Sequence, residues 1–155
     1  MAHYEATVTT AEDREKVFAY LADFRSAVEW DPATKQSWLR RGVPGRPGAE
    51  FRLVSRFMGR DVPLTYRTVE VDRPRRIVLV AEAAAATSRD EITLAELGDG
   101  GTAVTYSADL RLHGPLRVLD PLIAVFFSRL GENARRQMSR RLSEPLEREP
   151  SEAAA

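Results

Sequence analysis

The sequence contains no cysteine and only two histidines, His3 and His113, among its 155 residues. The absence of cysteine excludes disulfide bonds, thiolate metal sites and cysteine nucleophiles. Two histidines so far apart in the chain also make an ordinary zinc site or a histidine-supported serine triad a poor expectation. We therefore expect a protein that holds no metal and uses no cofactor.

An excess of charge of either sign is also missing, because 23 basic residues balance 23 acidic ones. Binding to nucleic acid depends on surplus lysine and arginine, so nucleic acid is not an expected partner. The longest apolar run, near residues 119–127, is interrupted by Asp120 and Pro121. It is far shorter than the roughly 20 residues of a membrane span, and no secretory signal opens the sequence. These absences predict a soluble, cytoplasmic protein without stable membrane insertion.

The composition itself is that of an ordinary globular protein, with 43% hydrophobic and 30% charged residues. The length suits one domain and is too short for two. We expect a single domain over residues 1–145, as a monomer or homodimer. Residues 146–155 are charged and rich in alanine, which predicts a disordered tail.

Alternation of apolar and polar residues predicts seven strands, separated by short turns. They are expected near residues 4–9, 36–41, 51–58, 64–69, 77–83, 88–97 and 102–112. Between the first two strands, a helix is expected from a capping pattern at Thr10 to about Ala22. A short second helix follows at residues 26–30 and ends before Pro32. The short turns, above all the glycine-rich one at residues 98–101, make the sheet antiparallel.

Apolar residues three or four apart, from Leu116 to Leu142, predict one long amphipathic helix after the last strand. Gly114-Pro115 precedes this helix and Pro145 follows it. The fold class is therefore α+β. A single helix about 10 Å across cannot fill the concave face of a curled seven-stranded sheet, so we expect a cavity between helix and sheet.

Several segments resemble the START-like, or SRPBCC, superfamily. They are residues 17–24, Trp30-Asp31-Pro32, residues 69–77 and residues 100–106, and the resemblance covers about residues 3–143. The nearest branch is the polyketide cyclase/dehydrase and lipid-transport group. The resemblance implies a helix-grip fold, in which a curved antiparallel sheet wraps around a long C-terminal helix and encloses an apolar cavity. Members include aromatase/cyclases, lipid carriers and hormone receptors, so function has to be argued from the site.

The inward register of the strands and the helix stripe give the residues that we expect to line this cavity. They are Trp30, Phe51, Leu53, Ser55, Phe57, Leu64, Tyr66, Thr68, Leu79, Val104, Tyr106, Ala108, Ile123, Phe126, Phe127 and Leu130. Tyr66 and Tyr106 are the main polar candidates, because an inward tyrosine has a hydroxyl that needs a partner. That partner is either a ligand or, in a purely structural role, protein or water.

Glu70 falls where the resembling aromatase/cyclases have an inward arginine that is thought to hold the substrate. A glutamate there could act as a general base if it were desolvated, whereas at the end of a strand it would be solvated. Two functions therefore remain open. One is a carrier or sensor of a small hydrophobic lipid, isoprenoid or polyketide-like ligand. The other is a cofactor-independent polyketide cyclase or dehydratase using Tyr66, Tyr106 or Glu70. The missing arginine and the apolar lining favour the first.

Overall fold

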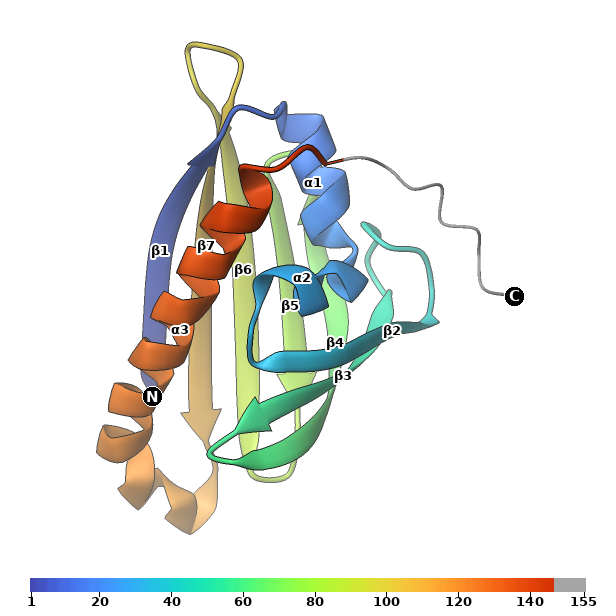
Figure 1. Cartoon of the computed structure of the whole chain (residues 1–155). Coiled ribbons are helices and arrows are strands. Elements are labelled where there is room, and N and C mark those ends of the chain that lie inside the picture. The colour runs from blue at the N-terminus through green and yellow to red at the C-terminus, as the bar shows by residue number, and fades with distance from the viewer. Residues whose placement is uncertain (147–155) are drawn as a thin grey trace.

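The computed structural model describes residues 1–146, and it consists of one curved sheet with a long helix across its inner face (Figure 1). The strands are β1 (Ala2–Thr10), β2 (Thr34–Arg41), β3 (Glu50–Phe57), β4 (Arg60–Asp72), β5 (Arg76–Glu82), β6 (Ala86–Glu96) and β7 (Thr102–Leu112). All pairings are antiparallel, and the order is β1-β7-β6-β5-β4-β3-β2. This architecture confirms the predicted α+β helix-grip fold. The predicted tail lies outside the described residues, apart from Leu146.

Two short helices and a turn connect β1 to β2. Helix α1 (Arg14–Ala22) is capped by Asp13, whose carboxylate accepts a hydrogen bond from the Lys16 backbone N–H at 3.0 Å. The expected cap at Thr10 was wrong, because the Thr10 hydroxyl donates to the Leu142 backbone carbonyl at 2.6 Å instead. The 3-10 turn η1 (Phe24–Ser26) and helix α2 (Ala27–Trp30) follow, and the chain leaves α2 just before Pro32.

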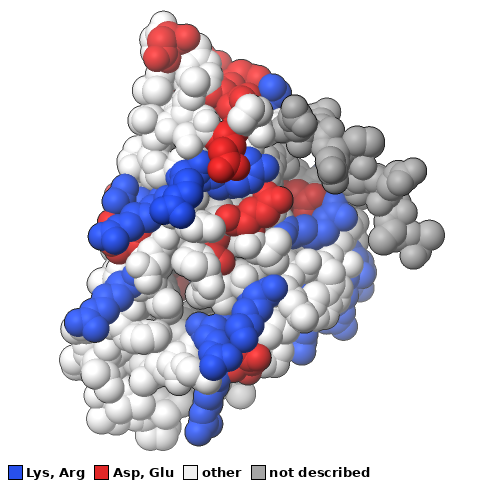
Figure 2. Space-filling view, viewed as in Figure 1, with Lys and Arg blue, Asp and Glu red and all other residues white. Residues whose placement is uncertain are grey.

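The long C-terminal helix starts later than its apolar stripe predicted. A 3-10 segment, η2 (Gly114–Leu119), precedes α3 (Asp120–Leu142). In Figure 1 these first turns extend beyond the lower end of the sheet, so apolar side chains there remain exposed. They are Leu116, Val118, Leu119, Leu122 and Val125. The corresponding lower left region of Figure 2 is mostly uncharged. Within residues 1–146, no helix is long and apolar enough to cross a membrane.

Helix α3 passes over β1 at Gly131. A Cβ atom at this position would lie 2.3 Å from Cγ of Tyr4 on β1, far inside van der Waals contact. The Tyr4 ring therefore occupies the space that the side chain of any residue other than glycine would need at position 131. Its hydroxyl donates to Glu132 of the same helix at 3.3 Å, which further fixes the ring against α3.

Tight packing fills the space between α1 and the sheet. Val17, Phe18 and Leu21 of α1 are completely buried in one cluster with side chains from the inner faces of β3 to β7. Trp30 closes this cluster towards α3, and its indole N–H donates to Ser26 Oγ at 3.1 Å. The core therefore lies under α1 and the C-terminal turns of α3, in the upper half of Figure 1.

The two edges of the sheet differ. At one edge, β1 packs against α3. At the other edge, the pairing of β2 with β3 is irregular at two places, between Thr34 and Gln36 and between Leu39 and Arg41. Most side chains of β2 are exposed, including those of Lys35 and Arg40.

Candidate functional site

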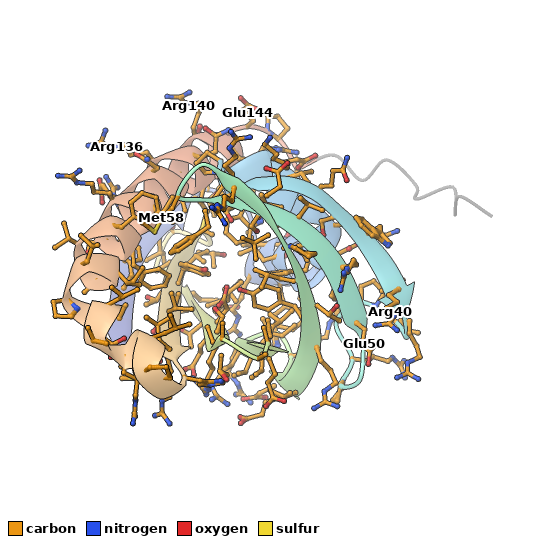
Figure 3. The ribbon with its side chains drawn as sticks, turned by 90° about the horizontal axis from the view of Figure 1, so that it is seen from below. Arg40, Glu50, Met58, Arg136, Arg140 and Glu144 are labelled. Atoms are coloured by element: carbon orange, nitrogen blue, oxygen red, sulfur yellow. The ribbon has the colours of Figure 1, made fainter. Side chains whose placement is uncertain are left out.

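A cavity of about 320 Å³ lies between the lower half of the sheet, α2 and α3. Its lining is mostly apolar. Exposed lining residues, Arg56 near the β3–β4 turn and Ala83 and Ala85 in the β5–β6 turn, mark its mouth. Buried lining residues, such as Trp30 and Tyr66, mark its inner end. Both turns are at the bottom of Figure 1, and Figure 3 views the molecule from this end.

Many of the residues expected at the cavity do line it. They are Trp30, Leu53, Ser55, Phe57, Leu64, Tyr66, Tyr106, Ala108, Phe127 and Leu130. They come from α2, β3, β4, β7 and α3. The alternation along the strands and the helical spacing therefore both identified side chains that face the cavity. The two tyrosines, the main polar candidates, meet at the inner end of the cavity.

Other expected residues are elsewhere. Phe51, Thr68, Leu79 and Val104 are buried further along their strands, and all of them except Thr68 belong to the packed core cluster. On α3, Ile123 is buried outside the lining, and Phe126 packs edge-on against Phe57 with ring centroids 5.2 Å apart. The expectation failed for the four strand residues because strand register fixes the face of a side chain but not its position along the cavity. It failed for Ile123 and Phe126 because helical spacing likewise gives a face of α3 and not the part of it that borders the cavity.

Glu70 does not reach the cavity. A β-bulge between Thr68 and Glu70 shifts the pairing of β4 with β5, so that the alternation seen at Tyr66 and Thr68 does not continue. Glu70 is exposed and forms an ion pair with Arg76 at 2.6 Å. It is therefore placed as a solvated surface residue rather than a desolvated base.

The polar end of the cavity is built around Asp90 of β6, which is almost completely buried. The Tyr106 hydroxyl donates to Asp90 Oδ2 at 2.8 Å, and the Ser88 hydroxyl donates to Asp90 Oδ1 at 3.0 Å. The Tyr66 hydroxyl donates to Ser88 Oγ at 3.1 Å and lies 3.5 Å from Asp90 Oδ1. Hydroxyls from three strands thus converge on one carboxylate, and we call these four residues the Asp90 cluster.

The sequence prediction missed Asp90 and Ser88, although a pattern for them was present. They share the inward register of β6 with Ile92 and Leu94, both buried. Ala108 lies directly opposite Asp90 in the pairing of β6 with β7, and Ala81 lies opposite Tyr66. A charged residue in an otherwise apolar register, opposite a small one, indicates a buried polar group next to open space.

Burial dominates the electrostatics of this end. It raises the pKa of Asp90 to about 6, against the opposing effect of the hydrogen bonds from Tyr106 and Ser88. A second carboxylate, Asp31 after α2, is half-buried, and desolvation raises its pKa although Thr34 donates a hydrogen bond at 2.8 Å. Among residues 1–146, neither carboxylate forms an ion pair. The cavity therefore has an acidic inner end without a compensating cation.

Burial also raises the pKa values of Tyr66 and Tyr106 well above 10, so both hydroxyls keep their protons near neutral pH. The rings pack among other aromatic side chains. Tyr66 lies 5.2 Å from Phe24, and Tyr106 lies 5.7 Å from Trp30, between ring centroids. This packing holds the hydroxyls in place, which is what a binding or proton-transfer site requires.

A second depression, of about 610 Å³, lies on the surface beside α1. Its lining is largely charged, and most of the charges are paired within the protein: Arg73 with Glu15 at 3.1 Å and Lys16 with Glu12 at 3.2 Å. No three histidine or acidic side chains in residues 1–146 are grouped to hold a metal ion. The apolar cavity with the Asp90 cluster is therefore the candidate functional site.

Comparison with known proteins shows the family of the chain. The model of a family described as polyketide cyclase / dehydrase and lipid transport matches residues 1–144. The chain belongs to this family. Membership in the polyketide cyclase/dehydrase and lipid-transport family confirms the resemblance drawn from residues 17–24 and the later segments. No curated protein sequence matches the chain.

Solved structures share the fold of this family member at low sequence identity. A START superfamily protein from Mycobacterium smegmatis has 19% identity and a TM-score of 0.76, covering 92% of this chain and 97% of its own. A protein from Thermus thermophilus has 16% identity and a TM-score of 0.74, with coverages of 90% and 96%. The Zhui aromatase/cyclase from Streptomyces sp. R1128 has 20% identity and a TM-score of 0.62, with coverages of 86% and 94%.

The hydrogen bond from Tyr106 to Asp90 leads to a testable prediction for the family member. Tyr106→Phe removes a donor that stabilises the Asp90 carboxylate, so the pKa of Asp90 is expected to rise above about 6. Carboxyl-carbon NMR titration measures the shift. Tyr20→Phe is the matched control, since the Tyr20 hydroxyl donates to Glu29 outside the cavity. An unchanged Asp90 titration in Tyr106→Phe would show that this hydroxyl does not donate to the carboxylate.

Proposed function

We propose that the protein binds a small, largely hydrophobic molecule, such as a lipid, an isoprenoid or a polyketide-like compound, in the cavity under α3. The single observation that best supports this is the combination of about 320 Å³ of apolar space with a buried polar group at its inner end. Ligand pockets commonly have volumes of about 300–1,000 Å³ and a few well-placed polar groups in an apolar lining. Membership in the polyketide cyclase/dehydrase and lipid-transport family supports the same proposal.

An environment-sensitive apolar dye tests the proposal directly. We expect saturable binding with a defined stoichiometry, and we expect Ala108→Leu to weaken it by about tenfold or more, equivalent to about 1.4 kcal/mol. Ala108 lines the cavity opposite Asp90, so the three added carbon atoms would occupy ligand space. Dye fluorescence at equilibrium gives both affinities.

The matched control is Ala103→Leu, an identical change on the same strand. Ala103 lies one position from the inward Val104 and does not line the cavity. Its variant should therefore bind the dye like the wild type. Non-saturable dye binding, or equal weakening by the two variants, would count against a ligand site at this place.

One observation favours a second, catalytic candidate. With a pKa of about 6, Asp90 is ionised near neutral pH in an apolar site and is a stronger base than an ordinary aspartate. It could accept a proton from a carbon between two carbonyl groups. Tyr66 or Tyr106 could then protonate the alkoxide that ring closure forms. The test is incubation with a linear poly-β-ketone thioester. Ring-closed product that disappears in Asp90→Asn would support a polyketide cyclase, and no product from the wild type would exclude it for that substrate.

A further inference from the structure

The protons of the Asp90 cluster are all committed to contacts inside the protein. A tyrosine or serine hydroxyl has one proton to donate and two lone pairs that accept. The protons of Tyr106 and Ser88 point at the two oxygens of Asp90, at 2.8 Å and 3.0 Å. The proton of Tyr66 points at Ser88 Oγ, at 3.1 Å, with Asp90 Oδ1 as its only other acceptor. No hydroxyl proton of the cluster is left for a molecule in the cavity.

Unused lone pairs, by contrast, remain on these side chains. Tyr66, Ser88, Asp90 and Tyr106 all line the cavity, and each oxygen keeps acceptor capacity beyond the bond that it already makes. As long as Asp90 is ionised, the inner end of the cavity therefore offers acceptors and no donor. A ligand group that only accepts would leave these oxygens and itself without partners, which is costly in an apolar site.

The charges around the cluster act in the same direction. Asp31 faces Asp90 from the end of α2, and its negative charge helps to raise the pKa of Asp90. Helix α3 contributes only uncharged residues to the lining, among them Phe127, Leu130 and Ala134. Among residues 1–146, the one cationic residue in the lining is Arg56, which is exposed at the mouth and forms an ion pair with Asp61 at 3.4 Å. Nothing in the lining would compensate a carboxylate brought to the inner end.

From this geometry we infer that the ligand enters with a hydrogen-bond-donating group first, a hydroxyl, a phenol or a protonated amine, and that the Asp90 cluster rejects carboxylates. The inference rests on the proposed binding function and deepens it by naming the polar end of the ligand. The apolar remainder of the ligand would extend along the cavity towards the mouth between Arg56 and Ala85.

Four para-substituted benzenes with the same butyl chain test the inference. They are para-butylphenol, a neutral donor; para-butylbenzylamine, a cationic donor; para-butylanisole, which only accepts; and para-butylbenzoate, an anion. Each competes with the bound apolar dye at about pH 8, where Asp90 is ionised. We expect the phenol or the amine to bind about tenfold or more tightly than the anisole, and the benzoate to bind most weakly. The tighter binder of the two donors shows whether the site prefers a neutral or a cationic head group.

Protonation of Asp90 should then reverse part of this preference. A protonated carboxyl supplies its own proton, which leaves one donor of the cluster free for the cavity. At about pH 5 we therefore expect the affinity ratio of phenol to anisole to fall towards one. Asp90→Asn, whose amide offers donors at every pH, should show a low ratio at both pH values. Asp109→Asn, a carboxylate of β7 paired with His3 outside the cavity, is the matched control and should keep the wild-type ratios.

The outcomes separate this inference from the proposed function. If the dye binds saturably while anisole or benzoate competes as well as phenol and amine at about pH 8, the inference fails and ligand binding stands. Failure of both donors to displace bound dye overturns the inference in the same way. Absence of saturable binding by the dye and by all four compounds would overturn the proposed function, and the inference with it.

Discussion

Gly131→Ala is expected to lower the free energy of unfolding by about 1–3 kcal/mol, the usual cost of overpacking a well-packed contact. Helix propensity alone predicts the opposite, because alanine is more favourable than glycine in a helix interior by about 1 kcal/mol. Packing should outweigh propensity here, since the new Cβ would lie 2.3 Å from Cγ of Tyr4. The ring cannot simply rotate away, because its hydroxyl donates to Glu132 on the same helix. Urea unfolding of the variant measures the effect.

Two further variants make this result specific. Gly98→Ala is the matched control, because a Cβ atom there meets nothing within 4 Å, and its stability should be close to that of the wild type. Tyr4→Ala combined with Gly131→Ala should lose less stability than the sum of the two single changes, since the first removes the ring that the second strikes. A Gly131→Ala protein as stable as the wild type would show that α3 can move off β1 at no cost.

The contribution of Asp90 to the stability of the wild-type protein is expected to fall by roughly 2 kcal/mol as the pH rises from about 4 to about 7. In the folded protein the pKa of Asp90 is about 6, above the value of 3.8 for a free aspartate. Between these values the folded state binds more protons than the unfolded state. The stabilising contribution of protonated Asp90 is thus complete below about pH 3.8 and is lost as the pH rises through about 6.

Asp90→Asn cannot titrate, so its free energy of unfolding should lack this loss over the same pH range. Some dependence should remain, because burial raises the pKa of Asp31 and the sign of its contribution is therefore the same. Asp109→Asn, on the exposed side of β7, should keep the wild-type slope. Parallel slopes for Asp90→Asn and the wild type, measured by urea unfolding at several pH values, would mean that Asp90 titrates normally.

The strands were predictable because their patterns are local. Val104, Tyr106 and Ala108 alternate with polar neighbours in β7, and the glycine-rich turn at residues 98–101 fixes its pairing with β6. Once seven such strands precede one long helix, few arrangements other than a curved antiparallel sheet around that helix bury the apolar faces. The fold followed from these elements, and the family resemblance agreed with it.

The site was harder to predict because it depends on where elements end and shift. The bulge after Thr68, which turns Glu70 outward, leaves no mark in the alternation of its neighbours. Val104 and Ala108 both point inward from β7, yet Val104 lies in the packed core and Ala108 lines the cavity. Which part of the inner face is filled is a tertiary property. Asp90 could have been found, since a carboxylate in the register of Ile92 is unusual enough to notice.

The irregular edge strand β2 also has a consequence for behaviour at high concentration. An exposed, regular edge strand is a template on which a strand of another molecule can pair, and this is a common route to aggregation. The two irregularities in β2 distort that template, and the exposed charged side chains of Lys35, Arg40 and Arg41 make the strand a poor partner for an apolar one. At the opposite edge, α3 packs against β1. These features disfavour the pairing of a strand from another molecule with either edge of the seven-stranded sheet.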